Sequence, residues 1–182
     1  TDMTLGEYYL ENQTVTLSYG TSDTLTINGL STDRNTVKIE DSTGTQYTVF
    51  VGDGNQTTLK PNAGENVVFI NSTGRDSFMG NTGVNIFTDC RNTYDGITGS
   101  ETGTNILIRP EKDTGMYAWG QNDKIILKDL ELSDLVYDFD NSYGYVYITN
   151  TKNSQKIQLQ NFASFGVNPT IVDKNGDTTT IL

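Results

Sequence analysis

The sequence predicts an all-β protein with a short parallel β-roll or β-solenoid in its middle, flanked by two related antiparallel β modules. Two observations lead to this fold class. Short stretches that alternate or run apolar follow one another along the chain, separated by Gly, Asn and Asp, which is the pattern of strands joined by tight turns. In the middle of the chain a short unit also recurs with a period near ten residues, as in stacked repeats.

Strand signals cover both flanks and the middle, whereas helix signals are scarce. One short helix or turn is expected in LELSDL, from Glu131 to Leu135. Two further segments, VGDGNQ and KNGDTT, have the composition of hairpin turns. The predicted strands outside the repeats are TVTLSYG, DTLTING, NTVKIED, TQYTVFVG, DKIILKDL, GYVYITN and QKIQLQNF.

The charge balance limits the partners. Twelve Lys and Arg stand against 23 Asp and Glu in 182 residues, giving a net charge of −11. Nucleic acid and anionic membrane surfaces need a basic face and are excluded, while cations such as calcium are attracted. No apolar run approaches the ~20 residues that a membrane span needs. The first residues, TDMTLGEYYL, lack signal-peptide features, so we expect the chain to be part of a larger polypeptide.

The residue types also argue against catalysis. There is one Cys, Cys90, and no His, which excludes an intrachain disulfide, the usual Cys/His zinc site and a histidine general base. A cysteine nucleophile would lack its histidine partner, so Cys90 is expected to be a small buried hydrophobe. We therefore predict no enzymatic activity, no catalytic residues and no organic cofactor.

The repeats lie between Asn62 and Asp123. In each unit an Asn or Asp, here called the anchor, precedes a short apolar strand. The first five anchors are 10, 9, 10 and 10 residues apart, and the last gap of 18 holds one weaker unit, DTGMYAW. One turn and one strand cannot bury their own apolar face, so the units must stack, two to a coil of ~20 residues. The anchors are Asn66, Asp76, Asn85, Asp95, Asn105 and Asp123.

The repeat predicts strand positions and core residues as well. Each strand should start one or two residues after its anchor, and one apolar side chain per unit should point into a shared core. The expected core residues are Val68, Phe78, Phe87, Ile97 and Leu107.

The units resemble degenerate copies of the nonapeptide repeat of the hemolysin-type calcium-binding (RTX) family, G-G-x-G-x-D-x-(apolar)-x. The G-x-D/N core is kept in Gly74-Arg75-Asp76, Gly83-Val84-Asn85 and Gly103-Thr104-Asn105, although the double Gly is lost and Asn replaces Asp at half of the anchors. The resemblance covers about a third of the chain. It implies a parallel β-roll in which Gly carbonyls and Asp carboxylates of neighbouring turns bind calcium.

Alternate anchors fall on opposite sides of such a roll. Asp76, Asp95 and Asp113, each two units after the one before, form the candidate calcium site. The other side carries Asn66, Asn85, Asn105 and Asp123, whose largely neutral side chains are expected to form a hydrogen-bonded ladder without metal. The alternative for both sides is that these residues only form turns.

The flanks are related to each other. Residues 17–59 align with residues 117–159 without a gap, with seven identities in 43 positions. We therefore expect residues 1–61 and 123–182 to be two copies of one β module that cap the repeats of residues 62–122, the whole being one continuous unit. The second copy also resembles the segment that follows calcium repeats in large RTX proteins, in Asp123 to Leu127, Ser133-Asp134-Leu135 and Gln158 to Phe162.

Two functions follow from these patterns. The RTX resemblance implies a structural or adhesive C-terminal module of a large bacterial protein secreted by type I export, which binds calcium weakly. The alternative is a carbohydrate-binding or polysaccharide-processing module that recognises a host or cell-surface glycan through exposed aromatics, of which Trp119, Tyr143, Tyr145 and Tyr147 are the candidates. A second acidic group, Asp134, Asp138, Asp140 and Asn141, resembles part of an EF-hand loop, but the twelfth position is Thr149 instead of the required Glu.

Overall fold

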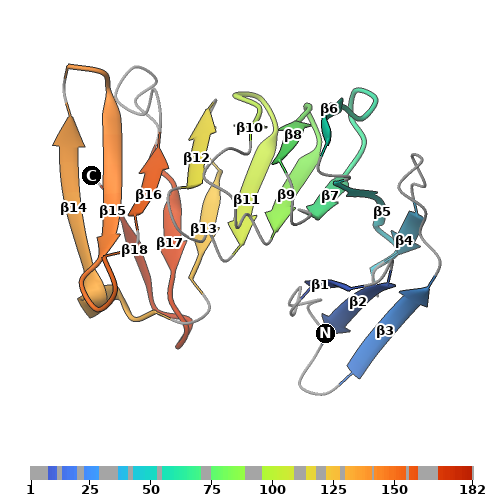
Figure 1. The fold of residues 1–182 in the computed structure, drawn as a ribbon, viewed down its shortest axis with the longest axis horizontal. Coiled ribbons are helices and arrows are strands. Elements are labelled where there is room, and N and C mark those ends of the chain that lie inside the picture. Colours follow the sequence, from blue (N-terminus) through green and yellow to red (C-terminus); the bar gives the residue numbers. More distant parts are fainter. Residues whose placement is uncertain are drawn as a thin grey trace.

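The fold is all-β, as predicted, and its strands form three open sheets (Figure 1). In the computed structural model one 3₁₀ turn is the only helical element among the residues that the structure describes. Those residues are 8–11, 14–19, 23–28, 37–40, 43–52, 55–70, 75–88, 96–108, 114–117, 122–127, 130–140, 142–154, 156–159 and 168–181.

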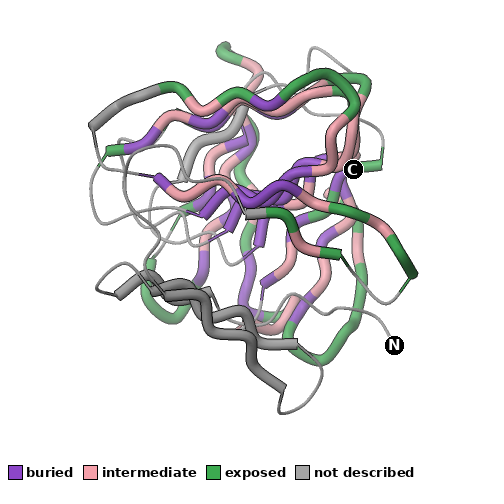
Figure 2. Tube along the Cα trace, turned by 90° about the vertical axis from the view of Figure 1, so that its right-hand side faces the viewer, coloured by how far each residue is buried: buried purple, intermediate pink, exposed green. Residues whose placement is uncertain are grey.

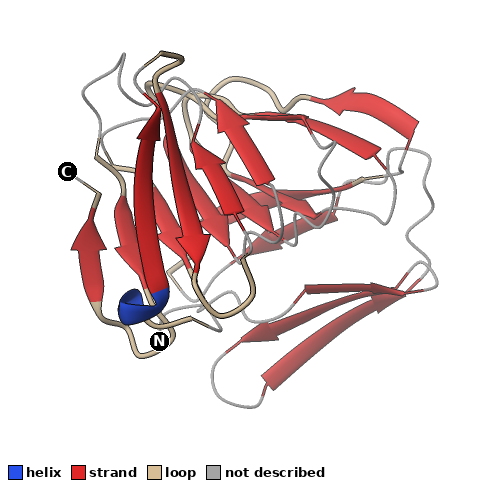
Figure 3. Cartoon of the chain, turned by 60° about the vertical axis from the view of Figure 1, so that its left-hand side comes forward, coloured by secondary structure: helices blue, strands red, loops and turns tan. Residues whose placement is uncertain are grey.

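The first sheet is small and antiparallel. It consists of β1 (Tyr8–Glu11), β2 (Thr14–Tyr19) and β3 (Asp23–Asn28), paired in that order. In Figure 1 this sheet lies at the same end of the molecule as β4 and β5, and Figure 3 shows it as a separate group of three strands.

The second sheet has eight strands in the order β18-β17-β13-β11-β9-β7-β5-β4. Its six inner strands pair in parallel, while β4 and β18 run antiparallel to their neighbours. The strands are β4 (Val37–Glu40), β5 (Gln46–Val51), β7 (Val67–Ile70), β9 (Val84–Thr88), β11 (Thr104–Ile108), β13 (Lys124–Ile126), β17 (Thr170–Val172) and β18 (Thr178–Thr180).

The third sheet has seven strands in the order β14-β15-β16-β12-β10-β8-β6. Pairing is parallel from β6 to β16 and antiparallel between β14, β15 and β16. The strands are β6 (Asn55–Leu59), β8 (Arg75–Met79), β10 (Gly96–Thr98), β12 (Thr114–Tyr117), β14 (Leu135–Asp140), β15 (Tyr145–Asn150) and β16 (Lys156–Leu159).

From β5 to β13, consecutive strands alternate between the eight-stranded and the seven-stranded sheet. Neighbouring strands of one sheet therefore come from units that are two apart in the sequence, as shown by the pairs Val68 with Ile86, Phe78 with Ile97, and Asn85 with Asn105. Alternate units therefore lie in the same sheet. The parallel pairing extends beyond residues 62–122, since β5, β6, β13, β16 and β17 also take part.

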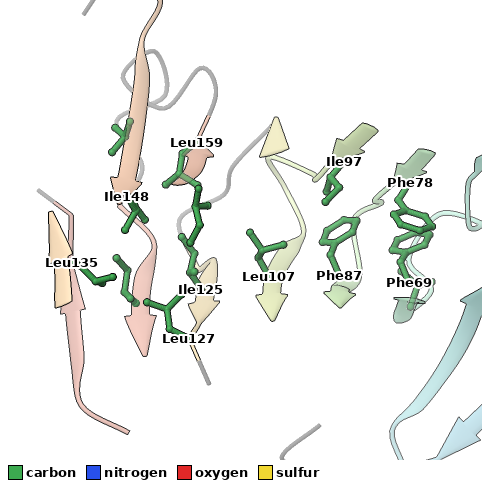
Figure 4. Close-up of a cluster of buried hydrophobic side chains, with 14 residues drawn as sticks. Phe69, Phe78, Phe87, Ile97, Leu107, Ile125, Leu127, Leu135, Ile148 and Leu159 are labelled. Carbon is green, nitrogen blue, oxygen red and sulfur yellow. The ribbon is translucent and has the colours of Figure 1, made fainter. Parts of the chain in front are cut away.

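The main core lies between the two large sheets (Figures 2 and 4). Phe69 stacks on Phe87 at 5.1 Å between ring centroids and contacts Phe78, from the opposite sheet, at the same separation. The core prediction is confirmed for Phe78, Phe87, Ile97 and Leu107.

The prediction for Val68 is wrong. Val68 packs in a second cluster with Val49 and Ile86, while Val67 and Phe69 belong to the main core. All four residues of β7 are buried, and a strand that is buried on both faces has no polar alternation to show which face is inward.

The predicted strand starts are only partly right. β7 and β13 begin one residue after Asn66 and Asp123, but β8, β9 and β11 begin one residue before Asp76, Asn85 and Asn105. The reason is visible at Asn85, whose side chain bonds back into its own turn while its backbone already pairs with Asn105.

The two predicted hairpin turns have different outcomes. KNGDTT connects the antiparallel strands β17 and β18, and Gly176 there has a φ of 85°. VGDGNQ is not a hairpin, because β5 and β6 on either side of it lie in different sheets.

The flanks correspond in strand positions but differ in pairing. An offset of one hundred residues superposes four strands of one flank on four of the other: β3, β4, β5 and β6 on β13, β14, β15 and β16. The turn between β4 and β5 contains Gly44 and the turn between β14 and β15 contains Gly144, both with positive φ. However, β5 pairs in parallel with β7, whereas β15 pairs antiparallel with β16.

Candidate functional site

The asparagine ladder links successive strands of the eight-stranded sheet. The Asn85 side-chain amide donates to Asn105 Oδ1 at 3.2 Å, and the Asn105 amide donates to Asp123 Oδ2 at 2.8 Å. At the other end, Val84 N–H donates to Asn66 Oδ1 at 3.1 Å. Asn85, Asn105 and Asp123 are at most 1% exposed. The predicted hydrogen-bonded ladder is therefore confirmed.

Asn85 and Asn105 each also close the turn that precedes their own strand. Asn85 Oδ1 accepts from Asn81 N–H at 2.8 Å and its Nδ2 donates to Asn81 O at 2.8 Å. Asn105 makes the same pair of bonds with Ser100, at 2.9 and 2.8 Å. Only a side chain with both a donor and an acceptor can do this. Asn therefore satisfies buried backbone groups that a carboxylate at the same position would satisfy only in part.

The glycines of the repeat allow the turns to stack closely. A Cβ on Gly83 would clash with the carbonyl of Glu65, and one on Gly103 would clash with the carbonyls of Asn81 and Gly83. Gly83 and Gly103 are thus needed for the close approach of backbone to backbone.

The candidate calcium side is described only at Asp76. Asp76 is the second residue of β8, is 2% exposed, and its carboxylate lies against Gly52, where an added Cβ would clash with it. Asp95 and Asp113 lie outside the described residues. The register of β8 and β10 includes the pair Ser77 and Gly96, each one residue after an anchor Asp. Within the described part of the chain, no three Cys, Asp or Glu side chains are grouped to hold a metal ion.

The group of acidic residues near 138 does not form one site. Asp134 ends the 3₁₀ turn (Leu132–Asp134), which confirms the expected short helix, and its carboxylate binds Lys152 Nζ at 2.7 Å. That hydrogen bond lowers the pKa of Asp134, against the opposing effect of burial. Asp140, at the far end of β14, accepts from Ser142 N–H at 3.0 Å.

Asp173 is a buried site residue that the sequence analysis missed. Its carboxylate accepts backbone N–H groups of Asn175 at 2.8 Å, Asp177 at 3.0 Å and Leu132 at 3.3 Å. Burial raises the pKa of Asp173, but these hydrogen bonds outweigh it and the net pKa is lowered. The signal was the Asp that precedes the Asn-Gly turn, because Asp readily bonds backbone two residues ahead.

Three tyrosines, here called the tyrosine strip, lie together near the start of β15. Tyr143 is 68% exposed and stacks on Tyr145 at 5.6 Å, and Tyr145 contacts Tyr147 edge to face at 6.4 Å. Lys156 Nζ lies 5.6 Å from the Tyr147 ring centroid. The fourth aromatic candidate, Trp119, lies outside the described residues.

No protein-family model matches the chain, and neither a curated protein nor a solved structure does. None of the helical structure in the described ranges is long and apolar enough to cross a membrane.

Proposed function

We propose that the chain is a non-catalytic structural or adhesive module of a larger secreted bacterial protein, with an RTX-like β-roll as its central part. The alternation of strands between two parallel sheets, with same-sheet partners two units apart, supports a roll of this kind. The role is mechanical: a stack of strands with a continuous core holds its two ends apart and presents its outer faces.

The asparagine ladder is the observation that carries the proposal. In an RTX roll, calcium ions connect successive turns. Here the amides of Asn85 and Asn105 bond to the next turn directly and to their own turn at the same time. The eight-stranded side therefore needs no metal, and the module is proposed to fold in the absence of calcium.

On the opposite side, Asp76 together with Asp95 and Asp113 is proposed to bind calcium weakly. Carboxylates that face one another across turns repel without a cation, and an ion that binds only the folded state stabilises it by about 2.7 kcal/mol at a hundredfold excess over Kd. The loss of the double glycines removes carbonyl ligands, so we expect affinity in the millimolar range of extracellular calcium modules.

The test is a pair of melting curves, one in EDTA and one in several millimolar calcium. We expect cooperative unfolding in EDTA with a β-type circular dichroism spectrum, and a modest rise in Tm with calcium that Asp76→Asn with Asp95→Asn abolishes. Asp138→Asn with Asp140→Asn is the matched control, and it should keep the calcium response. Loss of structure in EDTA would contradict the metal-independent roll. A Tm without any calcium response would reduce the three aspartates to turn formers.

A further inference from the structure

We propose that the outer face of β14, β15 and β16 binds a neutral oligosaccharide chain along the tyrosine strip. This binding activity goes beyond the structural role proposed above and does not depend on it. It is argued from the sheet register, the burial of the opposite face and the chemistry of the exposed side chains.

The sheet register brings aromatic and polar side chains into rows. Cross-strand partners point to the same face, so Tyr147 has Asp138 on one side and Gln158 on the other. One row further along, Thr149 lies between Val136 and Lys156. Rows are about 6.7 Å apart along the strand, and neighbours within a row about 4.8 Å apart.

The platform is held rigidly from behind. The intervening residues Val146, Ile148 and Leu159 are at most 1% exposed and belong to the main core. Tyr145 and Tyr147 therefore sit on a strand that cannot shift without opening the core, while Tyr143 lies in the turn just before it. Because these side chains are already held in place, binding costs little conformational entropy, and such preorganisation favours affinity.

The side chains suit a sugar ring, which has apolar C–H faces and hydroxyl edges. Tyrosine offers a broad apolar ring with a polar tip. Asp138 is an acceptor for hydroxyls, and the Gln158 amide offers both donors and an acceptor. Gln158 Nε2 already lies 3.4 Å from the Tyr147 hydroxyl, so ring and amide are presented side by side.

The charges favour a neutral ligand. The face combines Asp138 and Asp140 with Lys156, while the whole chain carries −11, which repels acidic polysaccharides. A cationic ligand would compete with the ammonium of Lys156, which lies over Tyr147. A protein partner would need a larger apolar centre. In the described rows of this face, Val136, 53% exposed, is the one aliphatic side chain.

The experiment is affinity electrophoresis in native gels. Separate gels contain β-glucan, xylan or mannan as neutral polysaccharides, and one gel contains alginate as an acidic polysaccharide. The parent chain should be retarded by at least one neutral polysaccharide. Tyr145→Ala with Tyr147→Ala should weaken that binding about tenfold or more, as expected when aromatic contacts are lost. Tyr145→Phe with Tyr147→Phe should retain most of it, because the rings stay.

Two controls separate stacking from folding. Tyr145→Leu with Tyr147→Leu keeps apolar bulk without rings and should bind as poorly as the alanine pair. Lys38→Ala, exposed on β4 of the other large sheet, should bind like the parent. If the alanine pair does not fold by circular dichroism, Tyr143→Ala and Gln158→Ala replace it and should each weaken binding. Retardation by no neutral polysaccharide, retention of binding in the leucine pair, or a preference for alginate would overturn the proposal.

Discussion

The carboxylate of Asp123 accepts two hydrogen bonds from Asn105, one from its backbone N–H at 2.7 Å and one from its side-chain amide at 2.8 Å. Both residues are buried. A single buried carboxylate therefore ends a row of neutral amides, and the donors of Asn105 hold its charge in place. This arrangement depends on the amide at position 105, because an acid there would set oxygen against oxygen.

Asn105→Asp is therefore expected to destabilise the fold strongly. The substitution replaces the donor that faces Asp123 and Ser100 O by a second buried carboxylate, at a cost of about 3–5 kcal/mol. Like charge and burial raise the pKa of the new carboxyl, so its protonation restores a donor as the pH falls. The deficit in unfolding free energy, measured by urea denaturation, should shrink between pH 7 and pH 5.

Asn66→Asp is the matched control. Asn66 lies at the partly exposed end of the ladder, where its Oδ1 accepts from Val84 N–H and an acid would keep that bond. An acid would lose only the long hydrogen bond of 3.3 Å from Asn66 Nδ2 to Gln46 O. We expect a loss below about 1 kcal/mol. Equal losses at both positions would mean that the ladder does not distinguish amide from acid.

Gly103→Ala should lower stability by about 1–3 kcal/mol, because the new methyl meets the carbonyls of Asn81 and Gly83, and backbone can yield only by shifting the stack. Gly96→Ala provides the comparison, since its nearest neighbour is the Ser77 side chain at 3.4 Å, an ordinary contact. Thermal melts should show little change for Gly96→Ala. An unchanged Tm for Gly103→Ala would show that the turns are not closely stacked.

The lowered pKa of Asp173 makes stability depend on pH. A carboxyl whose folded pKa is below its unfolded value contributes stability above the unfolded pKa, about 3.9, and loses it as the pH falls through the folded pKa. Asp173→Asn should therefore lower Tm at pH 6 to 7. The difference from the parent should shrink as the pH falls below the unfolded pKa and through the lowered folded pKa. A difference that is constant with pH would exclude a contribution from the charge.

Phe87→Ala should cost about 3–5 kcal/mol of unfolding free energy. Phe87 is fully buried and stacks on Phe69 in the middle of the core. Phe139→Ala, at a residue 42% exposed near the end of β14, should cost far less. Urea denaturation of the two variants measures the contrast, and similar losses would contradict the placement of the core between the sheets.

The sequence was informative where one physical requirement selects the residue. The anchors at near ten-residue spacing predicted the ladder of Asn66, Asn85, Asn105 and Asp123, because turns that stack must satisfy the same buried groups each time. The strand class and the 3₁₀ turn at Leu132–Asp134 followed from local composition in the same way.

The sequence was less informative where contacts between distant segments decide which face a side chain occupies or which strands pair. The apolar run of β7 did not show that Val68 turns away from the main core, since both of its faces are buried. VGDGNQ and KNGDTT have similar composition, yet only the second joins paired strands. The local turn around Asp173 was readable from the sequence, but its bond from Leu132 N–H, 41 residues away, was not.

From β5 to β13, whether a strand lies in one large sheet or the other depends on whether an even or an odd number of strands precedes it. Phe78 of β8 and Ile97 of β10 are partners in one sheet, and β9, which lies between them in the sequence, belongs to the other. Removal or insertion of two consecutive strands would therefore leave every later strand in its present sheet. Removal of a single strand and turn would send all later strands to the opposite sheet, so that the amide anchors of one side would meet the carboxylate anchors of the other. Natural relatives that differ in length between β5 and β13 are therefore expected to differ there by even numbers of strands.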